Sequence, residues 1–187
     1  MPSKPLSLPA WDLSDLFSSI TDPKIEATLT TCKTQAERFQ KTYKGKLAGL
    51  AKQPAKFKNV IRTYERLVEA YAKPQIYAAL VHAADSLKPE NGAFLQKVDV
   101  KSLEISRYFL FFELELGALP DKILANLIKA KELANYSHYL SRIRDYKPHR
   151  LDEAREQLLS DLSVSSGGAF TRLHEEELSR FKYASPM

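Results

Sequence analysis

The chain has 187 residues, of which 44% are hydrophobic and 27% are charged, with a formal net charge of +5. This length and composition allow one domain with a core of ordinary size. The single cysteine, Cys32, excludes a disulfide framework and any zinc site made of several cysteines. No apolar stretch approaches the ~18 residues of a membrane span, and the first residues contain no apolar signal segment. We therefore expect a cytoplasmic protein.

The first 20 residues are predicted to be extended, because three prolines keep them out of a helix: Pro2, Pro5 and Pro9. Residues 21–187 are predicted to form a single all-helical domain. Asp22 and Pro23 have the residue types of an N-cap and a first helical position. Apolar residues then recur every three or four positions from Ile25 to Tyr43. Cys32 lies on this stripe, so we interpret it as a small buried side chain rather than a nucleophile.

A second helix is predicted to begin at Pro54, with a regular apolar stripe over 57–71. Pro74 is predicted to interrupt it and to begin a new helix, because a proline disfavours the helical conformation of the preceding residue. A break is expected at 85–89. One helix of nearly 30 residues should then run to Gly117, buried in its apolar second half. The alternation in 112–116 also fits a strand, but no partner strand is evident.

After Pro120 the apolar patterns shorten, and four short helices are predicted, at 121–130, 134–146, 151–163 and 168–182. The sequence SSGG at 165–168 separates the last two. Few glycines and few β-branched residues favour helix over sheet throughout. The predicted fold is all-α: two or three long antiparallel helices followed by several short ones.

The only string that resembles catalytic machinery is Leu173–Leu178, which reads LHEEEL. A zinc peptidase helix needs H-E-x-x-H, in which two histidines four apart bind one zinc ion and the glutamate activates a water molecule. Leu178 occupies the position of the second histidine, so the string is not that motif. Three further histidines do not converge in sequence: His82, His138 and His149. We assign no catalytic and no metal-binding residue to this chain, and the substrate-binding residues stay unassigned.

The excess positive charge is confined to the first third of the chain, since residues 1–60 hold 10 basic and 5 acidic side chains. Between Arg38 and Arg62 there are eight basic residues and no acidic one. Such a run is typical of a solvated helical face, and it also suits an anionic partner. Its aromatic neighbours lie on apolar stripes, so the pattern does not favour nucleic acid as a partner, and we expect no membrane partner.

Several strings, in order, resemble the N-terminal domain of oligoendopeptidase F, a thimet-oligopeptidase-like zinc metallopeptidase. The first is Trp11–Phe17, which reads WDLSDLF. It is followed by Phe39–Leu47, Tyr77–Asp85, Phe111–Leu116, Tyr139–His149 with LDEAREQLL after it, and more loosely Ser165–Leu173. The resemblance thus extends from about residue 10 to the end of the chain.

The resemblance implies that this helical lobe precedes a catalytic domain that carries the H-E-x-x-H zinc site. The lobe would help to roof a deep channel that admits short peptides. We therefore expect zinc and short oligopeptide substrates for the full-length protein, the catalytic domain as partner, and an inactive, zinc-free fragment. The alternative is a free-standing helical adaptor that binds protein partners through an exposed face.

Overall fold

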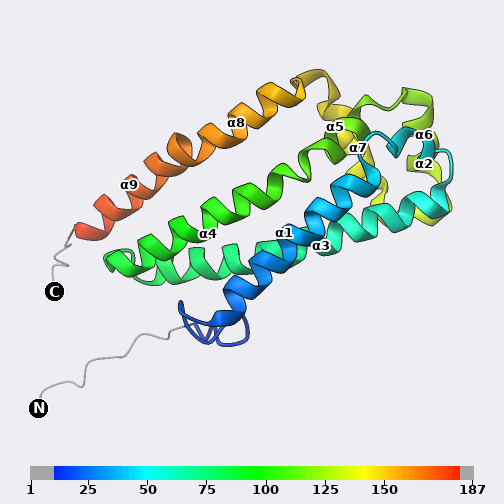
Figure 1. Ribbon diagram of the computed structural model, residues 1–187. Helices are drawn as coiled ribbons and strands as arrows, with labels where there is room; N and C mark the ends of the chain where they lie inside the picture. Colours follow the sequence, from blue (N-terminus) through cyan, green and yellow to red (C-terminus); the bar gives the residue numbers. More distant parts are fainter. Residues whose placement is uncertain (1–10, 182–187) are drawn as a thin grey trace, which may run out of the picture.

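The computed structural model describes residues 11–181 and shows a long helical bundle (Figure 1). Helices α1 (Pro23–Tyr43), α3 (Pro54–Ala84) and α4 (Pro89–Arg107) run antiparallel to one another in succession. A short helix, α2 (Leu47–Leu50), lies between the first two. No residue between 11 and 181 lies in a β-strand, so the predicted all-α fold is confirmed. None of the described helices is long and apolar enough to cross a membrane.

Helix α1 begins as its sequence predicts. The Asp22 side chain accepts a hydrogen bond from the Lys24 backbone N–H at 2.9 Å, and Pro23 occupies the first turn, where its missing N–H costs nothing. The apolar stripe is buried, including Cys32 and Phe39. Gly45, at φ 78°, turns the chain away just after the helix ends.

Helix α3 corrects one prediction, because it continues through Pro74 from Pro54 to Ala84. A proline inside a helix removes one hydrogen bond and costs about 3 kcal/mol or more. Here Pro74 is itself buried, and Tyr77 and Ala78 on the next turn are buried with it. Packing of α3 against α1 and α4 therefore offsets the local penalty that the sequence alone indicates.

A second correction concerns the predicted helix of nearly 30 residues, which is divided in two. Helix α4 ends at Arg107, and α5 covers Leu110–Ala118. The N–H groups of Tyr108 and Phe109 bond three residues back, to Ile105 and Ser106, so the backbone tightens between the two helices. Phe111 and Phe112 are then both buried, because α5 lies between α2, α7 and α8. The strand interpretation of 112–116 is excluded.

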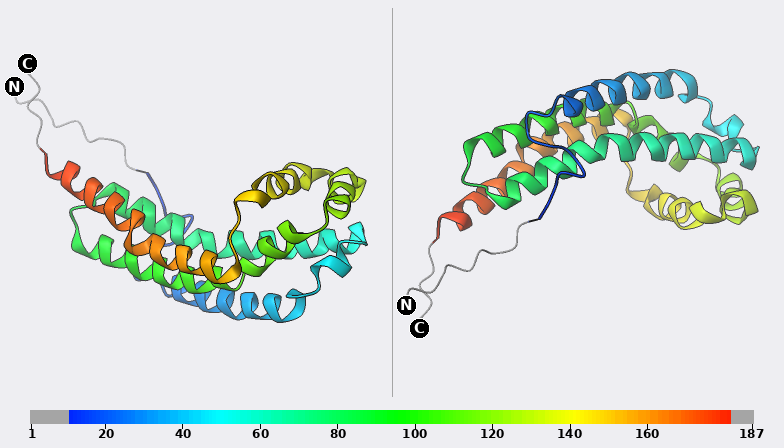
Figure 2. Two further views of the ribbon diagram at one scale, coloured as in Figure 1. Left: turned by 90° about the horizontal axis from the view of Figure 1, so that it is seen from above. Right: turned by 90° about the horizontal axis from the view of Figure 1, so that it is seen from below.

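The shorter elements α6 (Asp121–Lys129), η1 (Lys131–Tyr136), α7 (Ser137–Tyr146) and η2 (Lys147–His149) gather at one end of the bundle (Figure 2). The predicted helix 134–146 is therefore a 3₁₀ turn followed by an α-helix. Each element except η2 buries leucine or isoleucine against the core, and these are Leu124, Leu127, Leu133, Leu140 and Ile143.

Helices α8 (Glu153–Ser165) and α9 (Gly167–Arg180) follow one another almost in line along the flank of α4 (Figure 1). Asp152 caps α8 by accepting from the Arg155 N–H at 2.9 Å. Only Ser166 separates the two helices, where the sequence predicts a break. The last buried apolar side chain that the structure describes is Ile143, so no described side chain of α8 or α9 belongs to the core.

The predicted extended segment lies partly outside the described residues, which begin at Trp11. Residues 14–16 form a turn rather than an extended strand, with the Leu16 N–H bonded to the Leu13 carbonyl at 3.0 Å. Phe17 follows the turn and is buried against Tyr77, with ring centroids 5.3 Å apart. This end of the segment is therefore part of the core.

Candidate docking surface and groove on helices α8 and α9

The outer surface of α8 and α9 carries exposed apolar side chains. Most of the exposed large apolar residues of 11–181 lie in this part of the chain: Leu151, Leu158, Leu159, Leu162, Phe170, Leu173, Leu178 and Phe181. Phe170 is 71% exposed. Large exposed apolar patches mark sites of protein interaction in soluble proteins, so these residues are a candidate interaction surface. We call these eight residues the docking surface.

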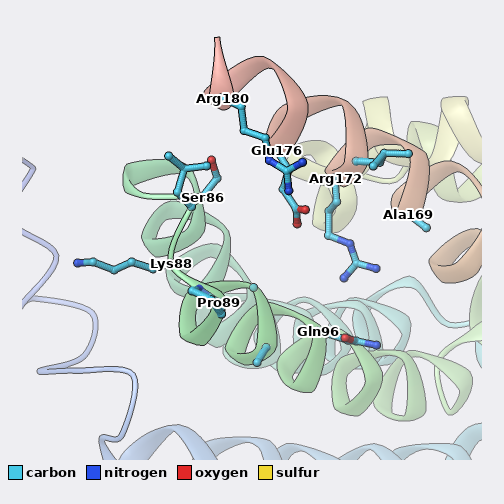
Figure 3. Close-up of a pocket in the computed structure, with 12 residues that line it drawn as sticks. Ser86, Lys88, Pro89, Gln96, Ala169, Arg172, Glu176 and Arg180 are labelled. Carbon is cyan, nitrogen blue, oxygen red and sulfur yellow. The ribbon is translucent and has the colours of Figure 1, made fainter. Parts of the chain in front are cut away.

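Helix α9 directs polar side chains toward its own domain. Arg172 and Glu176 are half-buried, and both point from α9 toward α4 (Figure 3). Phe170, Leu178 and Phe181 are exposed, at spacings of eight and three residues that place them on one side of a helix. The apolar side of α9 therefore faces away from the core, the reverse of a helix that only closes its own domain.

Polar contacts attach α8 and α9 to the rest of the bundle. The Arg107 guanidinium of α4 donates to the Asp161 carboxylate of α8 at 2.8 Å. Lys44 forms an ion pair with Glu153 at the start of α8, 2.6 Å away. At the far end, the hydroxyls of Ser86 and Ser179 lie 2.7 Å apart. Exposed contacts of this type contribute about 0–1 kcal/mol each, so these two helices are held more weakly than the core helices.

A groove of about 540 Å³ lies between α9 and the beginning of α4 (Figure 3). Small residues leave room for it, namely Gly92 and Ala93 on α4 and Ala169 on α9. Arg172 and Glu176 project into it from α9. The groove and the docking surface thus occupy different sides of the same helix, apart from Leu173, which belongs to both.

A polar cluster fixes the connection that leads into α8. The Arg150 guanidinium donates to the Glu113 backbone carbonyl and lies 3.4 Å from the Glu113 carboxylate. The Tyr64 hydroxyl donates to the same carboxylate at 3.3 Å. Burial, first, and the charge of Glu113 raise the pKa of Tyr64, so this phenol stays protonated as a donor. Gly117 leaves the space that the Arg150 side chain needs, since an added Cβ would lie 3.1 Å from its Nη1.

The zinc ion that the resemblance implies does not fit the described residues. No group of three His, Cys, Asp or Glu side chains among them could hold a metal ion. His174 is exposed on α9 and Leu178 stands four residues on. The other histidines are scattered: His82 is buried in α3, while His138 and His149 are exposed in α7 and η2. We therefore derive no catalytic step from this part of the chain.

The sequence indicates two other features, Cys32 and the basic run from Arg38 to Arg62. Both lie far in sequence from the residues that line the groove. Cys32 is buried, which confirms that it is a core side chain, and burial raises the pKa of its thiol. The basic run from Arg38 to Arg62 covers the end of α1, α2 and the beginning of α3. Most of its side chains are exposed. An anionic partner for it stays a prediction.

The sequence predicts part of the docking surface and misses the rest. On α9 the sequence shows an irregular apolar stripe, Phe170, Leu173, Leu178 and Phe181, and all four of these side chains are exposed. The apolar residues of α8 are not predicted. Their signal is the cluster of Leu158, Leu159 and Leu162, which lie within about one turn of the helix, although Asp161 stands between the last two in sequence. The groove has no sequence signal, because its walls are far apart in the chain.

The fold and the surface thus define a helical lobe with an outward apolar face and, in its described residues, no cluster that could hold a metal ion. The family model described as Oligopeptidase F matches residues 115–183, which include η1 and helices α6 to α9. The chain is also similar to the Group B oligopeptidase PepB of Streptococcus agalactiae, with 28% identity over 160 residues. Both comparisons confirm the resemblance to the N-terminal domain of oligoendopeptidase F.

That similarity covers 85% of this chain and 26% of the streptococcal protein, so the chain spans about a quarter of the length of its curated relative. No solved structure matches.

Proposed function

We propose that this chain is the N-terminal domain of an oligoendopeptidase F-like zinc metalloendopeptidase that hydrolyses short peptides. In this proposal, residues outside the chain bind zinc and perform the hydrolysis. The support is the similarity to an oligopeptidase together with a lobe whose described residues do not fit a zinc site. The single free cysteine suits a reducing compartment, and we place the protein in the cytoplasm.

The observation that carries the proposal is the docking surface. Leu158, Leu159 and Leu162 on α8 and Phe170 on α9 are exposed although each could bury a large apolar area. Covering a fully exposed leucine or phenylalanine contributes about 1.5–3 kcal/mol. We infer that the catalytic part of the same protein covers this surface. Once covered, α8 and α9 would gain the apolar contacts that their own domain does not provide.

The role of the lobe would be to restrict access. A rigid bundle fixed beside a catalytic cleft leaves a narrow entrance, through which a short flexible peptide passes and a folded protein does not. Its long helices, α1, α3 and α4, share one core and would form a stiff wall. Selectivity for short peptides would then arise from this exclusion, without a specific contact to each substrate side chain.

The same surface also supports the second candidate, a free-standing adaptor that binds another protein. The coding sequence downstream of residue 187 distinguishes the two functions. A reading frame that continues into H-E-x-x-H supports the peptidase domain, and a stop codon supports the adaptor.

The docking proposal is tested in the full-length protein with two matched substitutions. Leu159 of α8 and Ile76 of α3 are each 53% exposed, so Leu159→Asp and Ile76→Asp place the same charge on equally exposed positions. We expect Leu159→Asp to lower kcat/KM for a short peptide about tenfold or more, because it buries a charge at the interface. Ile76→Asp should leave kcat/KM within about twofold of the wild type. Equal kcat/KM for the two variants would contradict docking through α8.

A further inference from the structure

The groove between α9 and the beginning of α4 has the dimensions of a peptide-binding site. Its α9 wall runs from Ala169 to Arg180, and Pro89 to Gln96 form much of the facing wall. Eleven residue steps of an α-helix span about 16 Å. An extended peptide rises about 3.3 Å per residue, so the groove accommodates about five residues. Its volume of about 540 Å³ is within the usual range for ligand sites.

The groove is lined by polar and apolar side chains, and its most enclosed cation is Arg172. This side chain is half-buried and points toward α4 (Figure 3). The other two cations of the lining are paired: Lys88 Nζ lies 3.4 Å from Asp85 Oδ2, and Arg180 Nη1 lies 2.6 Å from Glu177 Oε1. Arg172 forms no ion pair with any residue in the part of the chain that the structure describes, 11–181. The five donors of a guanidinium suit a carboxylate, which they can bind with two parallel hydrogen bonds.

Two carboxylates, Glu176 and Asp99, lie near Arg172. Glu176 projects into the groove one turn further along α9 and forms no ion pair with Arg172. Asp99 of α4 lies close enough for the Arg172 charge to act on it, although burial, the larger effect, raises the pKa of Asp99. A ligand carboxylate is therefore attracted to Arg172 and repelled by the neighbouring Glu176, while the other two cations of the lining, Lys88 and Arg180, already have carboxylate partners.

We propose that this groove binds a short peptide in an extended conformation and that Arg172 receives a carboxylate of that peptide. The carboxylate is either the C-terminus or an acidic side chain. This inference rests on the proposed function, because it takes peptides as the substrate class, and it adds a binding site on the N-terminal domain itself. The docking residues of α8 do not line the groove, and Leu173 is the one docking residue among the lining residues.

The test is a titration of the ¹⁵N-labelled chain with three N-acetylated peptides, followed through the backbone amides of Gly92 and Ala169. The first peptide is pentaalanine with a free C-terminus, and the second is the same peptide as its C-terminal amide. The third is Ala-Ala-Asp-Ala-Ala amide. We expect saturable shifts with the first, the third or both, and a binding constant at least fivefold weaker for the second. The first and third peptides distinguish a terminal carboxylate from an acidic side chain.

Two variants with matched controls test the residues. Arg172→Gln should weaken binding of the preferred peptide about tenfold. The control, Arg38→Gln, replaces an exposed arginine of α1 and should leave binding unchanged. Ala93→Phe fills the groove and should abolish binding, whereas Ala79→Phe places the same ring on an exposed position of α3. Equal binding by Arg172→Gln and wild type, or no saturable shift with any peptide, would overturn the inference.

This result is separable from the proposed function. Peptide binding is measured on this chain alone, and docking is measured by the activity of full-length Leu159→Asp. If this chain binds no peptide while full-length Leu159→Asp still loses activity, the peptide-binding proposal is contradicted and the docking proposal stands. If this chain binds the peptide and full-length Leu159→Asp keeps its activity, the docking proposal is contradicted and the peptide-binding proposal stands.

Discussion

The guanidinium of Arg107 on α4 holds the carboxylate of Asp161 on α8 through two donors, Nε at 3.2 Å and Nη2 at 2.8 Å. Gln157 donates to the same carboxylate oxygen at 2.9 Å. This contact joins α8 to the bundle, and none of the α8 side chains that the structure describes is buried. The position of α8 therefore depends on charge and hydrogen bonding, while the position of the core helices depends on apolar burial.

The Arg107–Asp161 contact predicts a shift in an individual pKa. Hydrogen bonds from Arg107 and then Gln157 lower the pKa of Asp161 below its ordinary value. Because this pKa is lower in the folded chain, the contact stabilises the docked position of α8 fully above about pH 4, the ordinary pKa of an aspartate. This stabilisation is lost as the pH falls through the lowered pKa of Asp161 in the folded chain. In Arg107→Gln the pKa of Asp161 should rise toward the ordinary value, as measured by carboxyl ¹³C NMR titration. Asp12, whose pKa is lowered by Ser14, is the internal control and should not move.

Two phenylalanines of opposite exposure predict very different effects on stability. Phe112 is 0% exposed and its ring stacks on Tyr64 at 4.4 Å between centroids, whereas Phe170 is 71% exposed. Phe112→Ala should lower the free energy of unfolding by about 3–5 kcal/mol, since it leaves a cavity. Phe170→Ala should change it by less than about 0.5 kcal/mol. Urea denaturation of both variants checks this, and equal losses would show that α9 is packed in a core after all.

Amide hydrogen exchange should separate α9 from the core helices. The amides of 169–181 are expected to exchange faster than those of 57–71, because no α9 side chain is buried while Phe57, Val60 and Ile61 are. Mass spectrometry of exchanged peptides measures both segments in one experiment. Protection of 169–181 equal to that of 57–71 would show that α9 needs no partner for its stability.

The close approach of Gly117 and Arg150 predicts that Gly117→Ala has opposite effects on stability in the wild type and in the Arg150→Ala variant. In the wild type, Gly117→Ala pushes a methyl group to 3.1 Å from Arg150 Nη1, and Arg150 is restrained by its bond to the Glu113 carbonyl. The substitution should therefore be neutral or destabilising. In an Arg150→Ala background the same substitution should stabilise by up to about 1 kcal/mol, the usual gain in helix propensity.

Thermal unfolding of the two single variants and the double variant measures this coupling. Additive effects would show that the two side chains do not restrict each other.

The helix positions were largely predictable from sequence because they depend on local signals. The cap at Asp22, the proline at Pro54 and the apolar stripes act within one or two turns. The errors at Pro74 and at 108–109 arose where tertiary packing outweighs a local rule. At Pro74 burial against neighbouring helices maintains the helix, and at Tyr108 the need to bury Phe111 and Phe112 together divides it.

The candidate site was predictable only in part, for a physical reason. An exposed apolar stripe is visible along one helix, as at Phe170 and Phe181, because all its members share one short segment. The groove needs Ala93 and Arg172 on facing helices, and their separation in sequence hides the pair. Whether α9 turns its polar side inward is likewise decided by packing and not by the spacing of its own residues.

The end of the buried core at Ile143 has a consequence for how the chain folds during synthesis. All the described core side chains, from Phe17 to Ile143, are available before the residues of α8 and α9 leave the ribosome. N-terminal parts of a chain fold first as they emerge. The bundle can therefore assemble while the apolar side chains of α8 and α9 are still sheltered. The exposed apolar side chains of α8 and α9 therefore reach solvent only after the core bundle, against which the polar sides of these helices pack, has formed.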